Sequence, residues 1–172
     1  EKVAIEALKI RGLGFIDEPR RVYPNERLMA NVLGFVGQEG LGLEGLELKL
    51  NDLLSGARRK IAFQKDARGR PLLVNGQLFT AAPDGATIQL TIDRDLQFFV
   101  ERELAQAVSE HEALAATAVV LDVQTSEILA MATLPTFNAN EGGRSRPETR
   151  RNRTVTDVFE PGSTMKTFVM AA

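Results

Sequence analysis

The residues whose types and spacing could do chemistry lie near the end of the sequence, in FEPGSTMKTFVMAA, where Ser163 stands three residues before Lys166. Pro161 and Gly162 precede the serine, and the apolar run after it favours a helix with Ser163 in its first turn. Because residues three apart share a helix face, the Lys166 amine can lie near the Ser163 hydroxyl and, when shielded from water, accept its proton. Free N–H groups at the helix N-terminus would stabilise negative charge on a bound carbonyl oxygen. The stretch therefore indicates an acyl-transfer site.

Two other interpretations of these residues stay open from spacing alone. The tetrapeptide also fits an N-cap serine followed by a solvated lysine, although the large apolar neighbours in TMKTFVM argue against a surface charge at Lys166. His111 is the single histidine, so a Ser-His-Asp triad is possible in principle. Its place at the end of an amphipathic helix suits a cation at a helix C-terminus better.

Charged clusters elsewhere do not favour a metal or nucleic-acid site. Three acidic residues on a leucine-rich helix could hold a metal: Glu44, Glu47 and Asp52. We expect instead a solvated face that pairs with arginines of the preceding segment, which are Arg20, Arg21 and Arg27. The basic runs at 57–60 and 146–153 have no interleaved aromatic residues for base stacking, so we interpret them as solvated charge. We expect no metal and no cofactor.

The composition is that of a globular protein with a sizeable core. The 172 residues are 44% hydrophobic, and 21 basic against 23 acidic residues give a net charge of -2, which provides no field to gather nucleic acid. The absence of cysteine excludes disulfides, thiol nucleophiles and thiolate metal sites. No apolar run approaches the roughly 18 residues that a membrane-spanning helix needs.

Sequence patterns in the first half predict short elements. Helical spacing predicts one helix from about Glu26 to Leu33 and a second over 43–54, and alternation predicts a β-hairpin over 57–74. The turn-formers AAPDG at 81–85 mark the best candidate for a domain boundary.

The second half predicts a strand over 86–93, then a helix over 94–111 with Asp93 as its N-cap, and then a hairpin of two buried strands. Ser126 stands in the hairpin turn where a left-handed backbone would be convenient. We expect the helix to pack on the hairpin and the polar, glycine-rich segment 137–153 to be a long mobile loop, least ordered over 141–150. Burial should fall on Leu96, Phe99, Val100, Val119, Leu121, Ile128 and Leu129.

Five segments, in order, resemble motifs of the class B penicillin-binding proteins, the bacterial D,D-transpeptidases that cross-link peptidoglycan during division and elongation. The most specific is RNRTVTDVFEPGSTMKTF, which is similar to the active-serine segment of that family. Two more resemble the opening of its transpeptidase domain and two resemble its non-catalytic pedestal domain: TIDRDLQ at 91–97, AVVLDVQTSEILAMATLPTFNAN at 118–140, RRVYP at 20–24 and GLEGLELKLNDLLSG at 42–56. Other acyl-serine proteins, such as β-lactamases, should lack the last two.

The resemblance implies an α+β fold of two parts. Residues 1–82 would be the C-terminal part of the pedestal or dimerisation domain, and 83–172 the N-terminal part of a transpeptidase domain built on an antiparallel sheet with helices. Ser163 would be the acyl nucleophile, Lys166 the general base, and the Ser163 N–H one half of the oxyanion hole. The family usually has glycine at the position of Ser126. Its S-x-N and K-[ST]-G segments follow the serine helix, and none follows here, so we expect a chain truncated just after the S-x-x-K.

By the same resemblance, the parent enzyme would bind the D-Ala-D-Ala end of peptidoglycan stem peptides and be acylated by β-lactams. It would be located at the extracytoplasmic face of the bacterial inner membrane, held by an anchor helix outside this sequence. Its partners could be other division or elongation proteins. We expect the chain alone to be inactive. The alternative is a non-catalytic interaction platform for cell-wall or division proteins.

Overall fold

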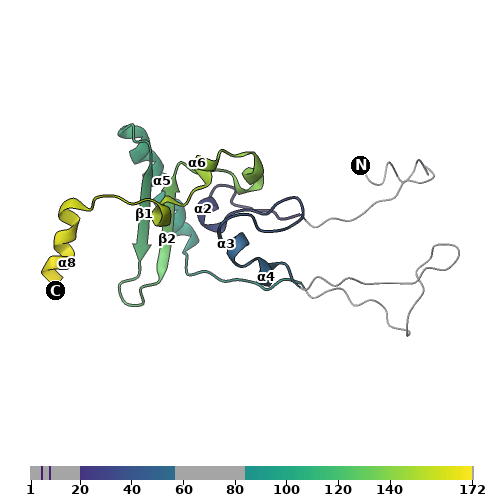
Figure 1. Ribbon diagram of the computed structural model, residues 1–172, viewed down its shortest axis with the longest axis horizontal. Helices are drawn as coiled ribbons and strands as arrows, with labels where there is room; N and C mark the ends of the chain where they lie inside the picture. The colour runs from purple at the N-terminus through teal and green to yellow at the C-terminus, as the bar shows by residue number, and fades with distance from the viewer. Residues whose placement is uncertain (1–4, 6–7, 9–19, 57–83, 172) are drawn as a thin grey trace.

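The computed structural model describes residues 5, 8, 20–56 and 84–171, and the elements in these ranges confirm a mixture of helices and antiparallel strands (Figure 1). The predicted hairpin over 57–74 lies outside the described residues. In chain order the elements are α2 (Ala30–Leu33), α3 (Gly45–Lys49), α4 (Asn51–Leu54), α5 (Arg94–Glu110), β1 (Ala116–Leu121), β2 (Ile128–Leu134), η1 (Ala139–Arg144), α6 (Pro147–Arg150), α7 (Arg153–Thr156), η2 (Gly162–Met165) and α8 (Lys166–Ala171).

The hairpin of β1 and β2 is antiparallel, with Ala116 opposite Leu134 and a register irregularity between Val120 and Leu121. Its turn confirms the predicted left-handed residue, since Ser126 has a φ of 63°. The Asp122 carboxylate accepts the N–H groups of Thr125 and Gln124, each at 2.8 Å. These two hydrogen bonds, that of Thr125 first, hold the pKa of Asp122 below its usual value.

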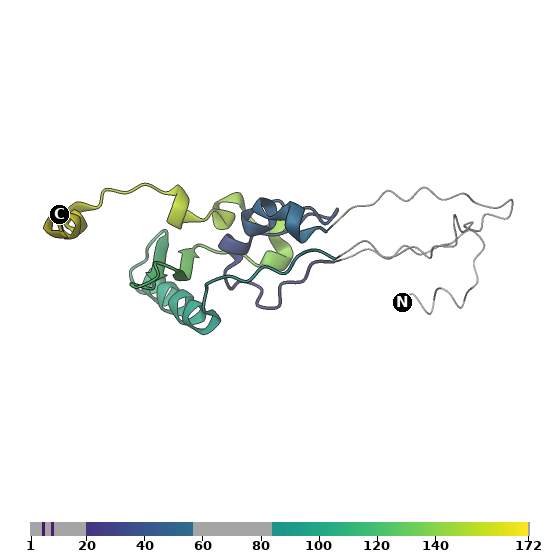
Figure 2. The ribbon, with the colours of Figure 1, turned by 90° about the horizontal axis from the view of Figure 1, so that it is seen from below.

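Helix α5 begins as predicted, because the Asp93 side chain accepts the N–H of Leu96 at 2.8 Å. The helix packs on one face of the hairpin, which confirms the expected pairing of these elements (Figure 2). Ala118 and Val120 of β1 face α5. Side chains alternate along a strand, so the residues between them face away from the helix.

Seven residues of this unit were predicted to be buried. Three of them are exposed, so the prediction was wrong there, and the other four are only half-buried. Val119 is 46% exposed and Leu121 53%, because these two strand residues lie on the face opposite α5. Phe99 of α5 is 50% exposed. The other predicted core residues, Leu96, Val100, Ile128 and Leu129, are half-buried. The residues buried at the contact between α5 and β2 are small or polar: Gln97, Ala130 and Ala132.

The buried Gln97 completes the edge of β2 as a neighbouring strand would. Its side-chain Nε2 donates to the carbonyl of Met131 at 2.9 Å, and its Oε1 accepts the N–H of Met131 at 2.8 Å. Nε2 also donates to Glu101 at 2.7 Å, and Glu101 in turn accepts the N–H of Met29. This fully buried amide therefore links the helix, the strand and the segment before α2.

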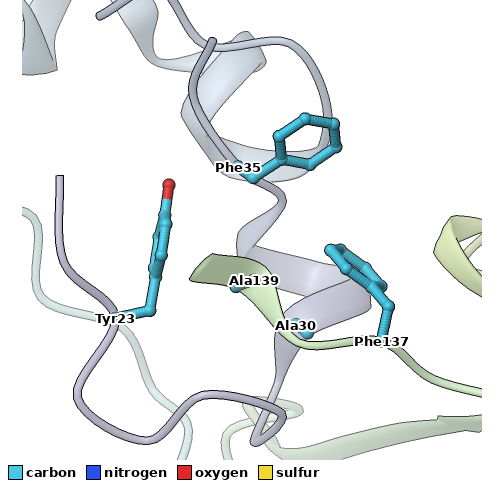
Figure 3. Packing of buried hydrophobic residues seen from close by; sticks show 5 residues of the cluster. All are labelled: Tyr23, Ala30, Phe35, Phe137 and Ala139. Atoms are coloured by element: carbon cyan, nitrogen blue, oxygen red, sulfur yellow. The ribbon is translucent and has the colours of Figure 1, made fainter. Parts of the chain in front are cut away.

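A small apolar core joins segments that are distant in the sequence (Figure 3). The rings of Phe35 and Phe137 meet edge to face, with centroids 6.0 Å apart and an interplanar angle of 77°. The same cluster contains Tyr23, Ala30 and Ala139. Its members come from both sides of the predicted domain boundary at 82/83, and that boundary stays a prediction.

The motifs at 20–24 and 42–56 meet at a buried carboxylate, which corrects the expected solvated acidic face. Glu47 is 8% exposed and lies 2.9 Å from Arg21 Nε, as predicted for this ion pair, and it accepts the Tyr23 hydroxyl at 3.1 Å. Burial first, and then the Glu47 charge, raises the pKa of Tyr23. Glu44 pairs instead with Arg150, at 3.2 Å, which was not among the expected partners.

Three predicted elements differ from the structure. The first helix begins at Ala30 rather than Glu26, after a series of turns, and the second is divided at Leu50 into α3 and α4. Residues 86–93 form no strand and run as an extended connection instead. Two hydrogen bonds hold this connection to the start of β2. The Thr91 hydroxyl donates to the Ile128 carbonyl at 2.7 Å, and the Asp93 N–H donates to the Leu129 carbonyl at 2.9 Å.

The prediction of a mobile loop over 137–153 was wrong, because η1 and α6 are packed against the first part of the chain. Asn31 donates to the carbonyl of Thr149 at 2.7 Å and accepts the hydroxyl of Thr136 at 2.6 Å. Arg150 lies over the ring of Phe35, 5.5 Å from its centroid. Polar side chains therefore fix this segment together with its two buried apolar residues, Phe137 and Ala139.

Candidate active site

The structure places Ser163 in a single 3-10 turn, η2, which leads directly into α8. The backbone N–H of Lys166 donates to the carbonyls of Ser163 and Thr164, so Ser163 and Lys166 stand one turn apart. Side chains three residues apart eclipse one another in a 3-10 turn. The backbone therefore puts the two residues on the same face of the segment, as their spacing predicted.

The turn before the serine is set by local backbone contacts. The N–H of Thr164 donates to the carbonyl of Pro161 at 3.1 Å, and the Thr164 hydroxyl donates to the same oxygen. Gly162 has a φ of 55°, a conformation that glycine adopts at no steric cost. Proline and glycine thus set the turn that leads directly into the helix.

Both candidate residues are exposed, and so are their apolar neighbours. Ser163 and Lys166 are exposed, while Phe168 and Met170 are 70% and 87% exposed. Figures 1 and 2 show α8 apart from the hairpin, at the end of a stretch without regular structure. The apolar surroundings that the sequence suggested for Lys166 are therefore not supplied by the described residues.

The segment is anchored at its base by Asp157 and two arginines of the basic run at 146–153, a role that differs from the solvated charge expected for that run. Asp157 accepts two arginines, with Arg151 Nη2 at 2.8 Å and Arg153 Nη1 at 2.9 Å. The hydrogen bond from Arg153 is the largest cause that holds the pKa of Asp157 below its usual value. A sequence signal was present, because Arg153 and Asp157 are four residues apart, the spacing of a helical ion pair.

The other candidate residues lie away from this segment in sequence and in role. His111 is the C-cap of α5 and is exposed, which agrees with the predicted helix end. Within residues 20–56 and 84–171, no group of three or more His, Cys, Asp or Glu side chains is arranged to hold a metal ion. No helix in that part of the chain is long and apolar enough to cross a bilayer.

The sequence matches the family described as "Penicillin binding protein transpeptidase domain" over residues 116–172. It is similar to the probable peptidoglycan D,D-transpeptidase PenA of Neisseria meningitidis, with 41% identity over 97% of this chain and 29% of PenA. It is also similar to the peptidoglycan D,D-transpeptidase FtsI of Escherichia coli, with 39% identity over 96% of this chain and 28% of FtsI. The chain thus spans less than a third of the length of these curated relatives.

Solved structures give the same result for the fold. The chain resembles penicillin-binding protein 3 of Mycobacterium tuberculosis with a TM-score of 0.72 and 35% identity, over 89% of this chain and 31% of that one. The complex of that protein with ampicillin matches with the same TM-score and identity, over 89% of this chain and 30% of the other.

Proposed function

Since the chain belongs to the class B penicillin-binding proteins, we propose that it carries the active-serine portion of a peptidoglycan D,D-transpeptidase. The observation that carries this proposal is the turn at Gly162–Met165, which puts the Ser163 hydroxyl one turn before Lys166 within the part of the chain that matches the transpeptidase family. This is the pairing of nucleophile and neighbouring base that acyl transfer to a serine requires.

In the first half of the proposed reaction, Ser163 Oγ attacks the penultimate D-Ala carbonyl of a stem peptide, and the Lys166 amine takes the hydroxyl proton. The Ser163 N–H is one donor to the resulting oxyanion. When the tetrahedral intermediate collapses, the bond to the terminal D-Ala breaks, and the leaving amine takes the proton that the Lys166 ammonium carries. The product is an ester between Ser163 and the shortened stem peptide.

In the second half, the amine of another stem peptide attacks the ester carbonyl. The Lys166 amine takes a proton from the attacking nitrogen as the new amide bond forms, and the resulting ammonium returns that proton to the Ser163 oxygen as it leaves. A β-lactam would follow the first half only: its ring amide opens on attack and the acyl group remains on the serine. Peptidoglycan stem peptides and β-lactams are therefore the proposed ligands, with the S-x-N and K-[ST]-G segments of the parent enzyme as further parts of the site.

The proposed location is the extracytoplasmic face of the bacterial inner membrane, where peptidoglycan cross-linking takes place, with other division or elongation proteins as partners. A role as an interaction platform is a second candidate function. It is supported by three leucines around α3 and α4, Leu43, Leu48 and Leu53, which are 50%, 55% and 54% exposed. Exposed apolar side chains that lie near one another suit protein contacts. The two roles are compatible in one protein.

The test is to incubate the protein as its gene encodes it with a labelled penicillin and to map the adduct by mass spectrometry. We expect one adduct, on Ser163, that is lost in Ser163→Ala and forms far more slowly in Lys166→Ala. Ser109→Ala is the matched control, because Ser109 is an exposed serine of α5. A stoichiometric adduct that persists in Ser163→Ala would contradict the proposed role of the serine.

A further inference from the structure

Side-chain hydrogen bonds join Arg151, Arg153, Thr156 and Asp157 just before the serine. Arg151 donates through Nε to the Thr156 hydroxyl at 2.8 Å and through Nη2 to the Thr156 carbonyl at 3.1 Å. The same Nη2 reaches Asp157 Oδ1 at 2.8 Å, while Arg153 Nη1 reaches the other oxygen, Oδ2, at 2.9 Å. Each carboxylate oxygen of Asp157 therefore has its own arginine.

This set of residues is fixed to the hairpin on the face away from α5. Asn152 caps α7 by accepting the Thr154 N–H, and its Nδ2 lies 3.5 Å from the sulfur of Met131, which is opposite Val119 in the register. The side chain of Arg153 is only 19% exposed, so the arginine packs as well as pairs. Helix α7 contacts both β1 and β2. Residues 158–171 are the serine segment, and its base is thus part of the packed body, by which we mean the described residues from 20 to 157.

Among the described residues, none after Asp157 is anchored to the hairpin in a comparable way. Val158 and Phe159 are 98% and 81% exposed, and Ser163 follows Asp157 by six residues. The backbone of Asp157 is itself extended, with φ -94° and ψ 136°, so it is the first residue of the approach to the turn at Pro161. The direction in which the chain leaves α7 is therefore set where the two arginines hold the carboxylate.

We propose that Asp157, held by Arg151 and Arg153, is a positioning residue that aims the approach to Ser163. This inference rests on the proposed function. The charge matters as well as the shape, because two guanidinium groups that converge on a neutral side chain would repel each other and lose their charge-assisted bonds. A nucleophile that is misplaced by about 1 Å can lose on the order of 10²-fold in rate.

The experiment measures the acylation of Ser163 by a labelled penicillin in the protein as its gene encodes it, at several penicillin concentrations. In Asp157→Asn we expect the saturating acylation rate to fall by about 10- to 100-fold, with little change in the penicillin concentration at half saturation. Arg153→Lys, which keeps the charge but not the planar fork, should fall between this variant and the wild type. Asp95→Asn is the matched control, because Asp95 forms an exposed pair with Arg94 at 3.1 Å.

Hydrogen exchange separates positioning from general loss of stability. In Asp157→Asn the amides of 158–166 should exchange faster while those of α5 and β2 keep the wild-type rates. Wild-type acylation in Asp157→Asn would overturn this inference alone, and so would a loss of rate that is matched by faster exchange throughout α5. A wild-type protein that is never labelled at Ser163 would overturn the proposed function, and this inference with it.

Discussion

The packed body and the serine segment of this chain contain similar residues in opposite environments. Phe35 and Phe137 in the body are 3% and 4% exposed, whereas Phe159 and Phe168 on either side of Ser163 are 81% and 70% exposed. The body is also joined by polar side chains that reach across more than a hundred positions, such as the two hydrogen bonds between Asn140 and the backbone of Tyr23. The difference teaches that stability resides in the body and that the candidate chemistry resides on a segment that adds little to it.

The largest effect should come from removing the buried amide that joins α5 to β2. Gln97→Ala leaves the N–H and carbonyl of Met131 without partners in a buried site, and it opens a cavity. We expect a loss of about 3 kcal/mol in the free energy of unfolding of the 172-residue chain, measured with urea. Gln106→Ala, on the exposed side of the same helix, is the control and should stay within about 0.5 kcal/mol of the wild type. Equal losses in the two variants would contradict the role of Gln97.

A smaller loss is expected where η1 meets the aromatic pair. A Cβ at Gly142 would lie 2.2 Å from the ring of Phe35, so Gly142→Ala forces the ring or the backbone to move. We expect a cost of about 2 kcal/mol, the middle of the range for overpacked cores. Gly143→Ala is a matched control, since a Cβ there meets nothing within 4 Å. If thermal unfolding showed the two variants equally stable, the packing of η1 against Phe35 would be wrong.

Much of this body could be predicted from the sequence where the signal is local. Asp93 before an amphipathic run, and Ser126 between two apolar strands, each specify their backbone through their immediate neighbours. The order of 137–153 could not be predicted in this way, because its partners, such as Asn31 and Glu44, are about a hundred residues away. The burial of Glu47 was missed for the same reason, since the Tyr23 hydroxyl that satisfies it lies outside its helix.

The candidate site shows the same division. Proline, glycine and the spacing of Ser163 and Lys166 predicted the turn and the shared face, and the structure places them so. Asp157 is held by Arg151, which comes before α7, and by Arg153, which lies within it. Helix α7 has only four residues, so hydrophobic periodicity could not reveal it in the sequence. The exposure of Phe168 could not be read from hydrophobicity, because an apolar helix is buried only when something packs against it.

Tyr23 allows a test of the body by pH, because it is the single tyrosine and the chain has no tryptophan. Its pKa is raised by burial and by Glu47, so the folded chain holds the phenolic proton more tightly than the unfolded chain does. Stability from this group is complete below the unfolded value of about 10 and falls by up to about 1.4 kcal/mol per pH unit as the pH rises above it. Phenolate absorbance should therefore appear near pH 10 in urea but not in the folded chain, and its appearance near pH 10 in both would show that Tyr23 is not buried.

The smallest effect should come from the serine segment itself. Phe168→Ser removes a large apolar side chain that is 70% exposed, so the free energy of unfolding of the 172-residue chain should change by less than about 0.5 kcal/mol. Phe137→Ser in the core is the contrasting variant and should cost several times more. A loss of about 2 kcal/mol or more in Phe168→Ser would mean that α8 packs on the body, and the comparison drawn here would fail.

Acylation of the 172-residue chain tests most directly whether the exposed turn at Ser163 is a competent site by itself. The folded chain is incubated with a labelled penicillin, and its mass is measured by mass spectrometry. Ser163 and Lys166 are both exposed in this chain, so water surrounds the hydroxyl and the amine, and only the turn itself positions them. We predict no adduct on Ser163 within hours, while the amides of α5 and β2 remain protected from hydrogen exchange. A stoichiometric adduct that maps to Ser163 would contradict the account, because it would mean that the isolated segment already forms a competent site.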